Sequence, residues 1–383
     1  MHSTRTALAA AAMLVCSYPQ PFANAQAQAQ EAALPRVRVS EDKTHFTREG
    51  TDRPFVIWGV NYDHDSEGEG RLLEDYWADE WEKVVEDFRE IKDLGANVVR
   101  IHLQTGRFLK AADQPDEENL KRLKDLVRLA EETGLYLDVT GLGCYHKQDV
   151  PAWYDALDEP ARWDAQAVFW KAVAGACKDS PAVFCYDLMN EPVLAPGEKA
   201  PKDWLAGDSL GGKYFVQRIT LDAKGRTNQE IAKAWLDRLT SAIKEVDDHT
   251  LITVGVIPWA QVFKGAKPLF HDPKVGEALD FTAVHFYPKA GKHDETLEAL
   301  KVYEVGKPLV IEEIFPLGAS LEETEAFINA SRSHVDGWIS FYWGKTIEEC
   351  EQVGDIKHAV VAAWLKRFKA LATAETGDEN KAP

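Results

Sequence analysis

Two glutamates, Glu191 and Glu313, each follow an apolar run that is typical of a buried strand. Glu191 lies near the end of VFCYDLMNEP, residues 183–192, where Pro192 cannot extend a ladder of hydrogen bonds and is expected to end the strand. Glu313 lies in KPLVIEEIF, residues 307–315. Two carboxyl groups held close together can split a glycosidic bond, because one protonates the leaving oxygen while the other attacks or stabilises the oxocarbenium-like centre.

The segments that must position these glutamates alternate between strand-like and helix-like patterns. Eight strand–helix units favour an α/β fold with a single closed (β/α)8 TIM barrel over an open sheet, and a short N-terminal β-hairpin at 36–47 is expected to cap its floor. A long loop at 193–226, between the fourth strand and its helix, is expected to be functional or mobile. The predicted strands are 55–61, 97–103, 135–142, 183–192, 251–257, 281–286, 309–314 and 337–343.

Polar and aromatic residues follow the ends of the predicted strands, where barrel enzymes place their active sites. Because side chains alternate along a strand, we expect only one of Glu312 and Glu313 to point inward, and periodicity does not choose between them. Asp187, inside an apolar strand, is expected to satisfy buried polar groups. The residues of this edge are Asn61, Arg100, His102, Asn190, Glu191, Trp259, His285, Tyr287, Glu312, Glu313 and Trp343.

Five motifs, in order along the chain, resemble those of glycoside hydrolase family 5, a clan A barrel family that includes cellulases and β-mannanases. The resemblance implies a retaining β-glycoside hydrolase in which Glu191 is the acid/base, Glu313 is the nucleophile, and the two carboxyl groups lie roughly 5 to 5.5 Å apart. The motifs are NVVRIHL (97–103), YDLMNEP (186–192), HFYP (285–288), KPLVIEEIF (307–315) and FYWG (341–344).

The same resemblance implies roles for the surrounding side chains. Arg100 would keep Glu313 ionised, since a nearby cation favours the charged form of a carboxyl group. Tyr287 would donate a hydrogen bond to the nucleophile, His285 would contact the acid/base or the sugar, and Asn190 would contact the sugar 2-hydroxyl. Trp343 would be the stacking platform beneath the cleaved sugar. The full set of expected substrate-binding residues is Trp343, Trp259, His102, Asn61 and His146.

The third strand departs from the family pattern. Many members carry a histidine near its end, where this chain reads DVTGLG at 138–143, and His146 is the loop residue that could replace it. The departure leaves two expected activities open, an endo-β-1,4-mannanase type and an endo-β-1,4-glucanase type, on a neutral β-linked polysaccharide or oligosaccharide.

Composition restricts the partners. With 44 Lys and Arg residues against 63 Asp and Glu residues, the formal net charge is −19, which argues against nucleic acid and polyanionic substrates. No CxxC or HExxH motif is present, so no metal or cofactor is expected. A monomer without a membrane partner is expected. The competing interpretations are a non-catalytic carbohydrate-binding barrel and a metal-dependent barrel enzyme, although the latter would need carboxylates on successive strands, which the predicted rim lacks.

The first 25 residues resemble an export signal, with Arg5, an Ala-rich apolar segment and small residues before the expected cleavage after Ala25. A secreted or periplasmic protein is therefore expected, and Val15 before Cys16 disfavours a lipoprotein. A spacer (26–35), the catalytic barrel domain (36–372) and a disordered tail (373–383) complete the predicted organisation. The remaining cysteines permit three full pairings, which stay open; they are Cys144, Cys177, Cys185 and Cys350.

Overall fold

The computed structural model describes residues 34–64, 70–206 and 212–375. The predicted export signal at 1–25, with its cleavage site, lies outside the described residues, as do residues 26–33 of the predicted spacer. Residues 376–383 of the predicted tail also lie outside them, whereas 373–375 continue the last helix.

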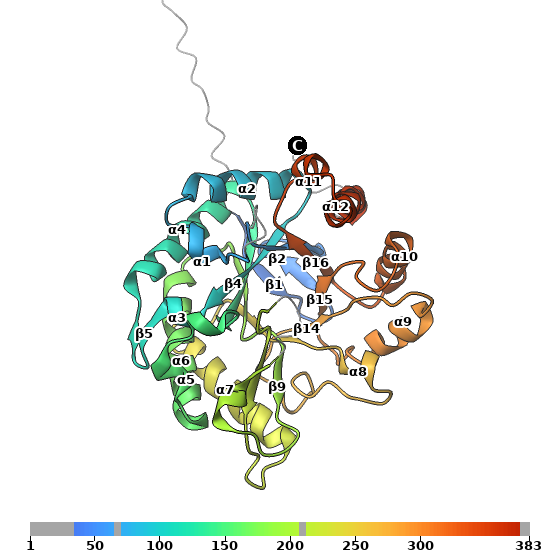
Figure 1. The fold of residues 1–383 in the computed structure, drawn as a ribbon. Coiled ribbons are helices and arrows are strands. Elements are labelled where there is room, and N and C mark those ends of the chain that lie inside the picture. Colours follow the sequence, from blue (N-terminus) through green and yellow to red (C-terminus); the bar gives the residue numbers. More distant parts are fainter. Residues whose placement is uncertain (1–33, 65–69, 207–211, 376–383) are drawn as a thin grey trace, which may run out of the picture. The chain divides into compact units, whose positions relative to one another are not determined.

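One parallel sheet forms the centre of the domain and confirms the predicted single (β/α)8 TIM barrel (Figure 1). Its strands are β3 (Ile57–Tyr62), β4 (Val98–Gln104), β7 (Tyr136–Gly143), β8 (Val183–Asp187), β12 (Leu251–Thr253), β13 (Gly255–Val256), β14 (Thr282–His285), β15 (Leu309–Ile314) and β16 (Gly337–Trp343). The neighbours follow the order β12-β8-β7-β4-β3-β16-β15-β14-β13. The fifth barrel strand is interrupted at Val254, so β12 pairs with β8 while β13 pairs with β14, and these two pairings close the ring.

Helices surround these strands and pack on their outer faces (Figure 1). Helix starts follow local chemistry: Thr227, Ser320 and Thr346 each form a capping box with a glutamate three residues later. The fifth barrel strand is followed only by the single turn α8. The helices are α1 (Leu73–Tyr76), α2 (Trp81–Asp93), α3 (Thr105–Phe108), α4 (Glu117–Thr133), α5 (Ala152–Asp155), α6 (Glu159–Cys177), α7 (Asn228–Lys244), α8 (Trp259–Val262), α9 (His293–Lys301), α10 (Leu321–Ser331), α11 (Ile347–Val353) and α12 (Ile356–Glu375).

The segment predicted as a long loop at 193–226 carries a small sheet of its own. Its strands are β9 (Pro192–Leu194), β10 (Leu205–Ala206) and β11 (Val216–Thr220), in the order β10-β11-β9. Barrel strand β8 ends at Asp187, and Pro192 begins β9, so the expectation that Pro192 closes the fourth barrel strand is wrong. The parallel pairing of β9 with β11 fixes the chain immediately after Glu191. A second hairpin, β5 (Leu109–Ala111) with β6 (Gln114–Pro115), lies between α3 and α4.

The predicted N-terminal hairpin is confirmed as β1 (Val37–Val39) and β2 (Phe46–Arg48). Phe46 is fully buried and meets Phe184 and Phe281 edge-on, with ring centroids 5.3 and 5.2 Å apart. Phe184 lies at the start of β8, and Phe281 immediately precedes β14. The hairpin therefore closes the end of the barrel opposite to the ends of the strands that carry Glu191 and Glu313.

The cysteines left open by the sequence, Cys144, Cys177, Cys185 and Cys350, are all buried and unpaired in the structure. Burial raises the pKa of the Cys144 thiol to about 12, so it stays protonated and inert at neutral pH. In the described part of the chain, no helix is both long and apolar enough to span a membrane.

The floor of the barrel provides a stability test. Replacing Phe46 by Ala should lower the free energy of unfolding by about 3–5 kcal/mol, because it leaves a cavity between two aromatic rings. The matched control is Phe263→Ala, since the Phe263 side chain is 60% exposed and its loss should cost no more than about 1 kcal/mol. Urea denaturation followed by tryptophan fluorescence measures both variants, and equal losses would contradict the role of the hairpin.

Candidate active site

Arg100, on β4, is fully buried at the centre of the polar cluster above the barrel core. Its Nη1 donates hydrogen bonds to Oε1 of Glu313 and Oδ1 of Asn61, both at 2.9 Å. Its Nη2 donates to Oδ2 of Asp187 at 2.8 Å and to Oδ1 of Asn190 at 3.0 Å. Burial alone would lower the pKa of Arg100, but the surrounding carboxylates raise it well above its ordinary value. Arg100 on β4 thus bonds to side chains on β3, β8 and β15 and to Asn190 on the turn after β8.

Glu313 has a donor on each oxygen. Arg100 bonds to Oε1, and the hydroxyl of Tyr287 donates to Oε2 at 2.5 Å. Burial raises the pKa of Tyr287 well above its ordinary range, and the negative charge of Glu313 adds to the effect, so the phenol remains a donor at neutral pH. Hydrogen bonds to both oxygens favour the ionised carboxylate. The predicted partnership of Arg100 and Tyr287 with Glu313 is present in the structure.

Glu191 lies on the turn after β8 and faces Glu313 from across the site. Its backbone φ is +49°, a strained conformation for a residue with a side chain, and a hydrogen bond of 2.9 Å from its N–H to the carbonyl of Gly255 helps to hold it. Its side chain is 19% exposed, and Nδ1 of His285 lies 2.9 Å from its Oε1. The structure therefore places His285 against the predicted acid/base.

The two predicted catalytic carboxyl groups lie close together. One oxygen of Glu191, one oxygen of Glu313 and a ring nitrogen of His285 all lie within 4.8 Å of one another. Carboxyl groups in retaining glycosidases lie about 5–5.5 Å apart, whereas inverting enzymes need about 6.5–9.5 Å to admit a water molecule. The spacing favours a direct attack by one carboxylate.

A β-bulge in β15 brings Glu312 and Glu313 into the interior together. Next to β14, the register moves from Val284–Ile311 to His285–Glu313, so β15 contains one extra residue, and a similar shift occurs against β16. A bulge re-aims the side chains that follow it. The expectation that only one glutamate of the pair points inward is therefore wrong. Glu313 lies at the rim and is 7% exposed, whereas Glu312 lies deeper and is fully buried.

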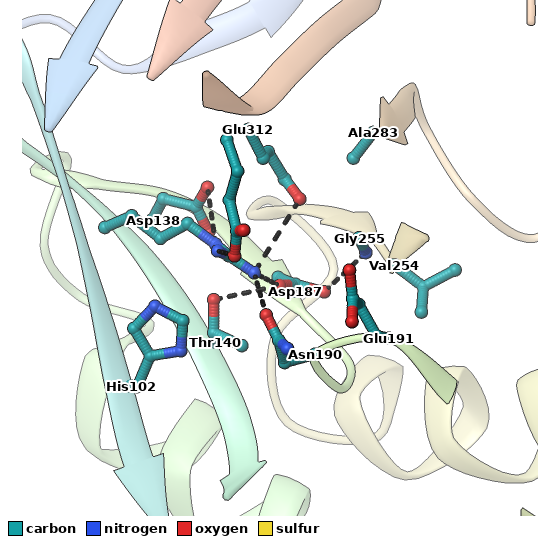
Figure 2. A network of polar contacts seen from close by, with 12 residues as sticks. His102, Asp138, Thr140, Asp187, Asn190, Glu191, Val254, Gly255, Ala283 and Glu312 are labelled. Carbon is teal, nitrogen blue, oxygen red and sulfur yellow. Dashed lines mark hydrogen bonds and ion pairs between the residues drawn. The ribbon is translucent and has the colours of Figure 1, made fainter. Parts of the chain in front are cut away.

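A second set of carboxyl groups, Asp138, Asp187 and Glu312, lies around Arg100, with one oxygen of each within 4.8 Å of the others (Figure 2). The sequence prediction concerned the rim, whereas this cluster lies below it and takes Asp138 and Asp187 from the neighbouring strands β7 and β8. Arg100 supplies positive charge there, with Nε 4.0 Å from Asp138 and Nη2 4.0 Å from Glu312. Burial raises the pKa of Asp138 well above its ordinary value, and it also raises that of Glu312.

Asp187 is the member of this cluster with the most donors. Its Oδ2 accepts from Arg100 and from the hydroxyl of Thr140 at 2.8 Å, and its Oδ1 accepts from the backbone N–H of Gly255 at 2.8 Å. These bonds confirm the expectation that Asp187 satisfies buried polar groups. Sequence reasoning missed Asp138, Thr140 and Gly255, although an aspartate inside the apolar strand 135–142 was an available signal.

Asn61 and His102 hold other side chains and leave no ring or amide group free for a sugar. Nδ2 of Asn61 donates to the carbonyls of Glu312 at 2.9 Å and Ser340 at 3.2 Å, while its Oδ1 accepts from Arg100. His102 has Nε2 3.0 Å from Oδ1 of Asn61 and Nδ1 2.6 Å from the hydroxyl of Tyr145. Burial, with the charge of Arg100, lowers the pKa of His102 well below its ordinary value and keeps it neutral. The structure thus does not favour the predicted substrate contacts of these two residues.

On β16, the tryptophan that was predicted to stack on the sugar is buried. Trp343 is only 2% exposed and packs in the hydrophobic core, with its ring centroid 5.9 Å from that of Tyr62. This burial does not favour its predicted role as a stacking platform. Phe341, on the same strand, is partly exposed, and its ring lies 6.3 Å from that of Tyr287 in an edge-on arrangement. Phe341 is therefore the better-placed aromatic of this strand, and the sequence did not single it out.

The other two predicted substrate residues lie in different places. Trp259, in α8, is 40% exposed and stacks on Phe263, with ring centroids 5.8 Å apart. Both line an apolar cavity of about 700 Å³, which continues from Pro192 directly after Glu191. His146 instead has Nε2 2.8 Å from the carbonyl of Gly70, a contact that does not place it among the glutamates.

The chain matches the model of the cellulase family, described as glycosyl hydrolase family 5, over residues 62–346. It is 27% identical over 138 residues to mannan endo-1,4-beta-mannosidase 5 of Arabidopsis thaliana, covering 32% of this chain and 24% of that protein. It is 25% identical over 200 residues to the probable mannan endo-1,4-beta-mannosidase C of Aspergillus terreus, covering 47% of this chain and 44% of that protein. These matches span less than half the length of either relative.

Solved structures share the fold. An exo-beta-1,4-mannosidase from an Opitutaceae bacterium superimposes with a TM-score of 0.66 at 18% identity, covering 90% of this chain and 64% of that one. A beta-1,4-D-mannanase from Cryptopygus antarcticus superimposes with a TM-score of 0.61 at 18% identity, covering 88% and 94%. Because the family model matches more than half of the chain and the barrel agrees with it, the chain belongs to glycosyl hydrolase family 5.

Proposed function

We propose that this protein hydrolyses a neutral β-1,4-linked mannan or its oligosaccharides with retention of configuration, using Glu313 as nucleophile and Glu191 as acid/base. The observation that carries the proposal is the approach of Glu191 and Glu313 within 4.8 Å in unlike surroundings. Glu313 receives hydrogen bonds from a cation and a phenol, whereas Glu191 contacts only His285 among the side chains of the described residues. Unlike surroundings of two carboxyl groups are what separate an acid from a nucleophile.

In the first step, a carboxylate oxygen of Glu313 attacks the anomeric carbon and forms a glycosyl ester. The bond to the leaving oxygen breaks with its electron pair, and Glu191 gives that oxygen its proton. In the second step, Glu191 takes a proton from water as the water attacks the anomeric carbon, and Glu313 leaves as a carboxylate. Two displacements return the original configuration.

His285 stabilises the acid/base after it has lost its proton. Burial alone would lower the pKa of His285, but the charge of Glu313 and contacts with Glu191 and Glu312 outweigh it and raise the pKa to about 10. The ring is therefore an imidazolium at neutral pH. It lies 2.9 Å from the oxygen of Glu191, where negative charge develops as the leaving group departs.

Asn190 is placed for the sugar hydroxyl next to the anomeric carbon. Its Oδ1 accepts from Arg100 and its Nδ2 donates to the carbonyl of Phe215 at 2.9 Å, so the orientation of the amide is fixed. The amide group has a second N–H, which can donate to a sugar oxygen. Such a contact with the 2-hydroxyl strengthens in the transition state.

Mannan is the preferred substrate because both named sequence relatives are mannan endo-1,4-beta-mannosidases, and several solved neighbours are mannanases. A β-1,4-glucan is the second candidate, since the family model carries the name cellulase. A non-catalytic binding barrel is not favoured, because Arg100 and Tyr287 hold Glu313 ready for reaction. The predicted export signal suits an enzyme whose polymeric substrate lies outside the cell.

We expect the purified protein to release reducing sugar from soluble β-mannan faster than from β-glucan. ¹H NMR during hydrolysis should show the β-anomer first, with the α-anomer appearing later by mutarotation, because two displacements preserve the configuration. Release of the α-anomer first would contradict the mechanism, and a faster reaction on β-glucan would contradict the preferred sugar.

The cavity beside Glu191 is proposed as the leaving-group side of the cleft. Pro192 and Val193 form its wall next to the acid, while Trp259 and Phe263 line it further out. The group that takes the proton from Glu191 must leave on this side, and aromatic rings bind the apolar C–H face of a sugar.

Trp259→Ala should raise KM for mannooligosaccharides with several leaving-group sugars by about tenfold, because it removes one stacking contact. The same change should leave KM for a short aryl mannoside within about twofold. Trp81→Ala is the matched control, since Trp81 opens α2 and lines a separate surface hollow. Initial rates on both substrates test this assignment, and equal effects on both would reject it.

A further inference from the structure

Glu312 is a fully buried carboxyl group without a hydrogen bond from any of the described residues. A buried carboxyl group that lacks donors is costly. The fold nevertheless inserts an extra residue into β15, which turns this side chain inward below Glu313. Because burying Glu312 in this way destabilises the fold, we expect this side chain to have a function.

The ring of His285 and the guanidinium of Arg100 both lie near Glu312, and the ring is the nearer of the two, at 3.8 Å against 4.0 Å. Nε2 of His285 is buried, makes no hydrogen bond within the described chain, and lies 3.8 Å from Oε2 of Glu312. The opposite ring nitrogen, Nδ1, lies 2.9 Å from Oε1 of Glu191. The imidazole ring therefore stands between the acid/base at the rim and the carboxyl group beneath it.

Gly255 leaves the space that lets the side chains of Glu312 and His285 lie close together. A Cβ added at Gly255 would lie 2.4 Å from Oε2 of Glu312 and 2.7 Å from Nε2 of His285. Contacts that short do not occur, so any larger residue at this position would push the carboxyl group and the ring apart. Gly255 lies at the break in the fifth strand, next to Asp187 and Glu312 (Figure 2).

The charged groups around Glu312 and His285 explain the protonation of these two side chains. Asp187 and Glu313 each accept several hydrogen bonds, one of them from Arg100. An imidazolium at His285 is a second cation beside Arg100, and burial raises the pKa of both Glu312 and Asp138, which favours their neutral acids. The titratable groups that face Glu312 and His285 are Arg100 on β4, His102 on β4, Asp138 on β7, Cys185 and Asp187 on β8, Glu191 after β8, and Glu313 on β15.

We propose that Glu312 is a positioning residue for the acid/base step: its carboxyl group, which faces Nε2 of His285 at 3.8 Å, favours the doubly protonated ring, with Nδ1–H directed at Glu191. The inference rests on the proposed function of Glu191 as acid/base. Once Glu191 has given its proton to the leaving group, the imidazolium holds the resulting carboxylate. Glu312 acts through His285 and does not touch the sugar.

Glu312→Leu removes the carboxyl group that faces Nε2, so His285 loses its second proton and Glu191 loses a neighbouring positive charge. Loss of a nearby cation raises the pKa of a carboxyl group. The basic limb of the kcat/KM profile reports the deprotonation of the acid in the free enzyme. We therefore expect this limb to move to higher pH by about one unit or more. Removal of an ionised Glu312 would instead move the limb to lower pH.

Two variants separate this role from general damage. Glu312→Gln keeps a side-chain oxygen facing His285 and should leave the basic limb of the kcat/KM profile near its wild-type position. Gly255→Ala should move this limb in the same direction as Glu312→Leu. Asp138→Asn is the matched control, because Asp138 is equally buried in the same cluster but lies beside Arg100 and Cys185. Asp138→Asn should leave the basic limb of the kcat/KM profile at its wild-type pH. An unmoved limb in Glu312→Leu, a downward shift, or an equal shift in Asp138→Asn would overturn the proposal.

A readout without substrate keeps the test independent of activity. ¹⁵N NMR of the wild-type protein at neutral pH should show both ring nitrogens of His285 protonated, with the assignment made by comparison with His285→Gln. A single protonated nitrogen would overturn the proposal. If the wild-type protein hydrolyses neither mannan nor glucan, the proposed function fails, while the ring protonation still decides whether Glu312 holds His285.

Discussion

The ion pairs of Arg100 are the interaction on which the rest of the site depends. A buried guanidinium is costly unless it is paired and hydrogen-bonded, and here its two terminal nitrogens bond to four side chains. Asp187 holds the cation from β8, and Glu313 accepts from it on β15. The same cation that permits several carboxyl groups to be buried also bonds to Glu313, the proposed nucleophile. The barrel interior and the proposed chemistry therefore depend on the same residue. Removing one partner of such a buried pair typically costs about 3–5 kcal/mol.

The carboxyl groups of this site form two levels. At the rim, Glu191 and Glu313 lie within reach of a substrate, one contacting His285 and the other contacting Arg100 and Tyr287. Below them, Asp138, Asp187 and Glu312 are fully buried. In the proposed first displacement, negative charge moves from Glu313 to Glu191, so the total charge among the buried groups does not change. A site arranged in this way needs little reorganisation as charge develops.

The sequence was sufficient for the barrel, because apolar strands have a clear period and their ends are marked by polar residues. The choice of Glu313 over Glu312 rested on the resemblance to family 5 and not on periodicity. The sequence was insufficient where backbone geometry departs from regularity. The bulge in β15 breaks the alternation that the assignment of Glu312 relied on. The pairing of Pro192 with β11 depends on residues 25 positions away, which no local pattern reveals. Trp343 and His102 were read as substrate contacts, but tertiary packing buries both.

The central claim is that Glu313 forms the covalent bond to the sugar. A 2-deoxy-2-fluoro mannosyl fluoride slows both displacements but slows the second more, so the glycosyl-enzyme should accumulate. Peptide mass spectrometry after digestion should then locate the added sugar on Glu313, in a modified peptide that is absent from Glu313→Gln. A label on Glu312 or Glu191, or an unmodified protein that still turns over mannan, would contradict the account.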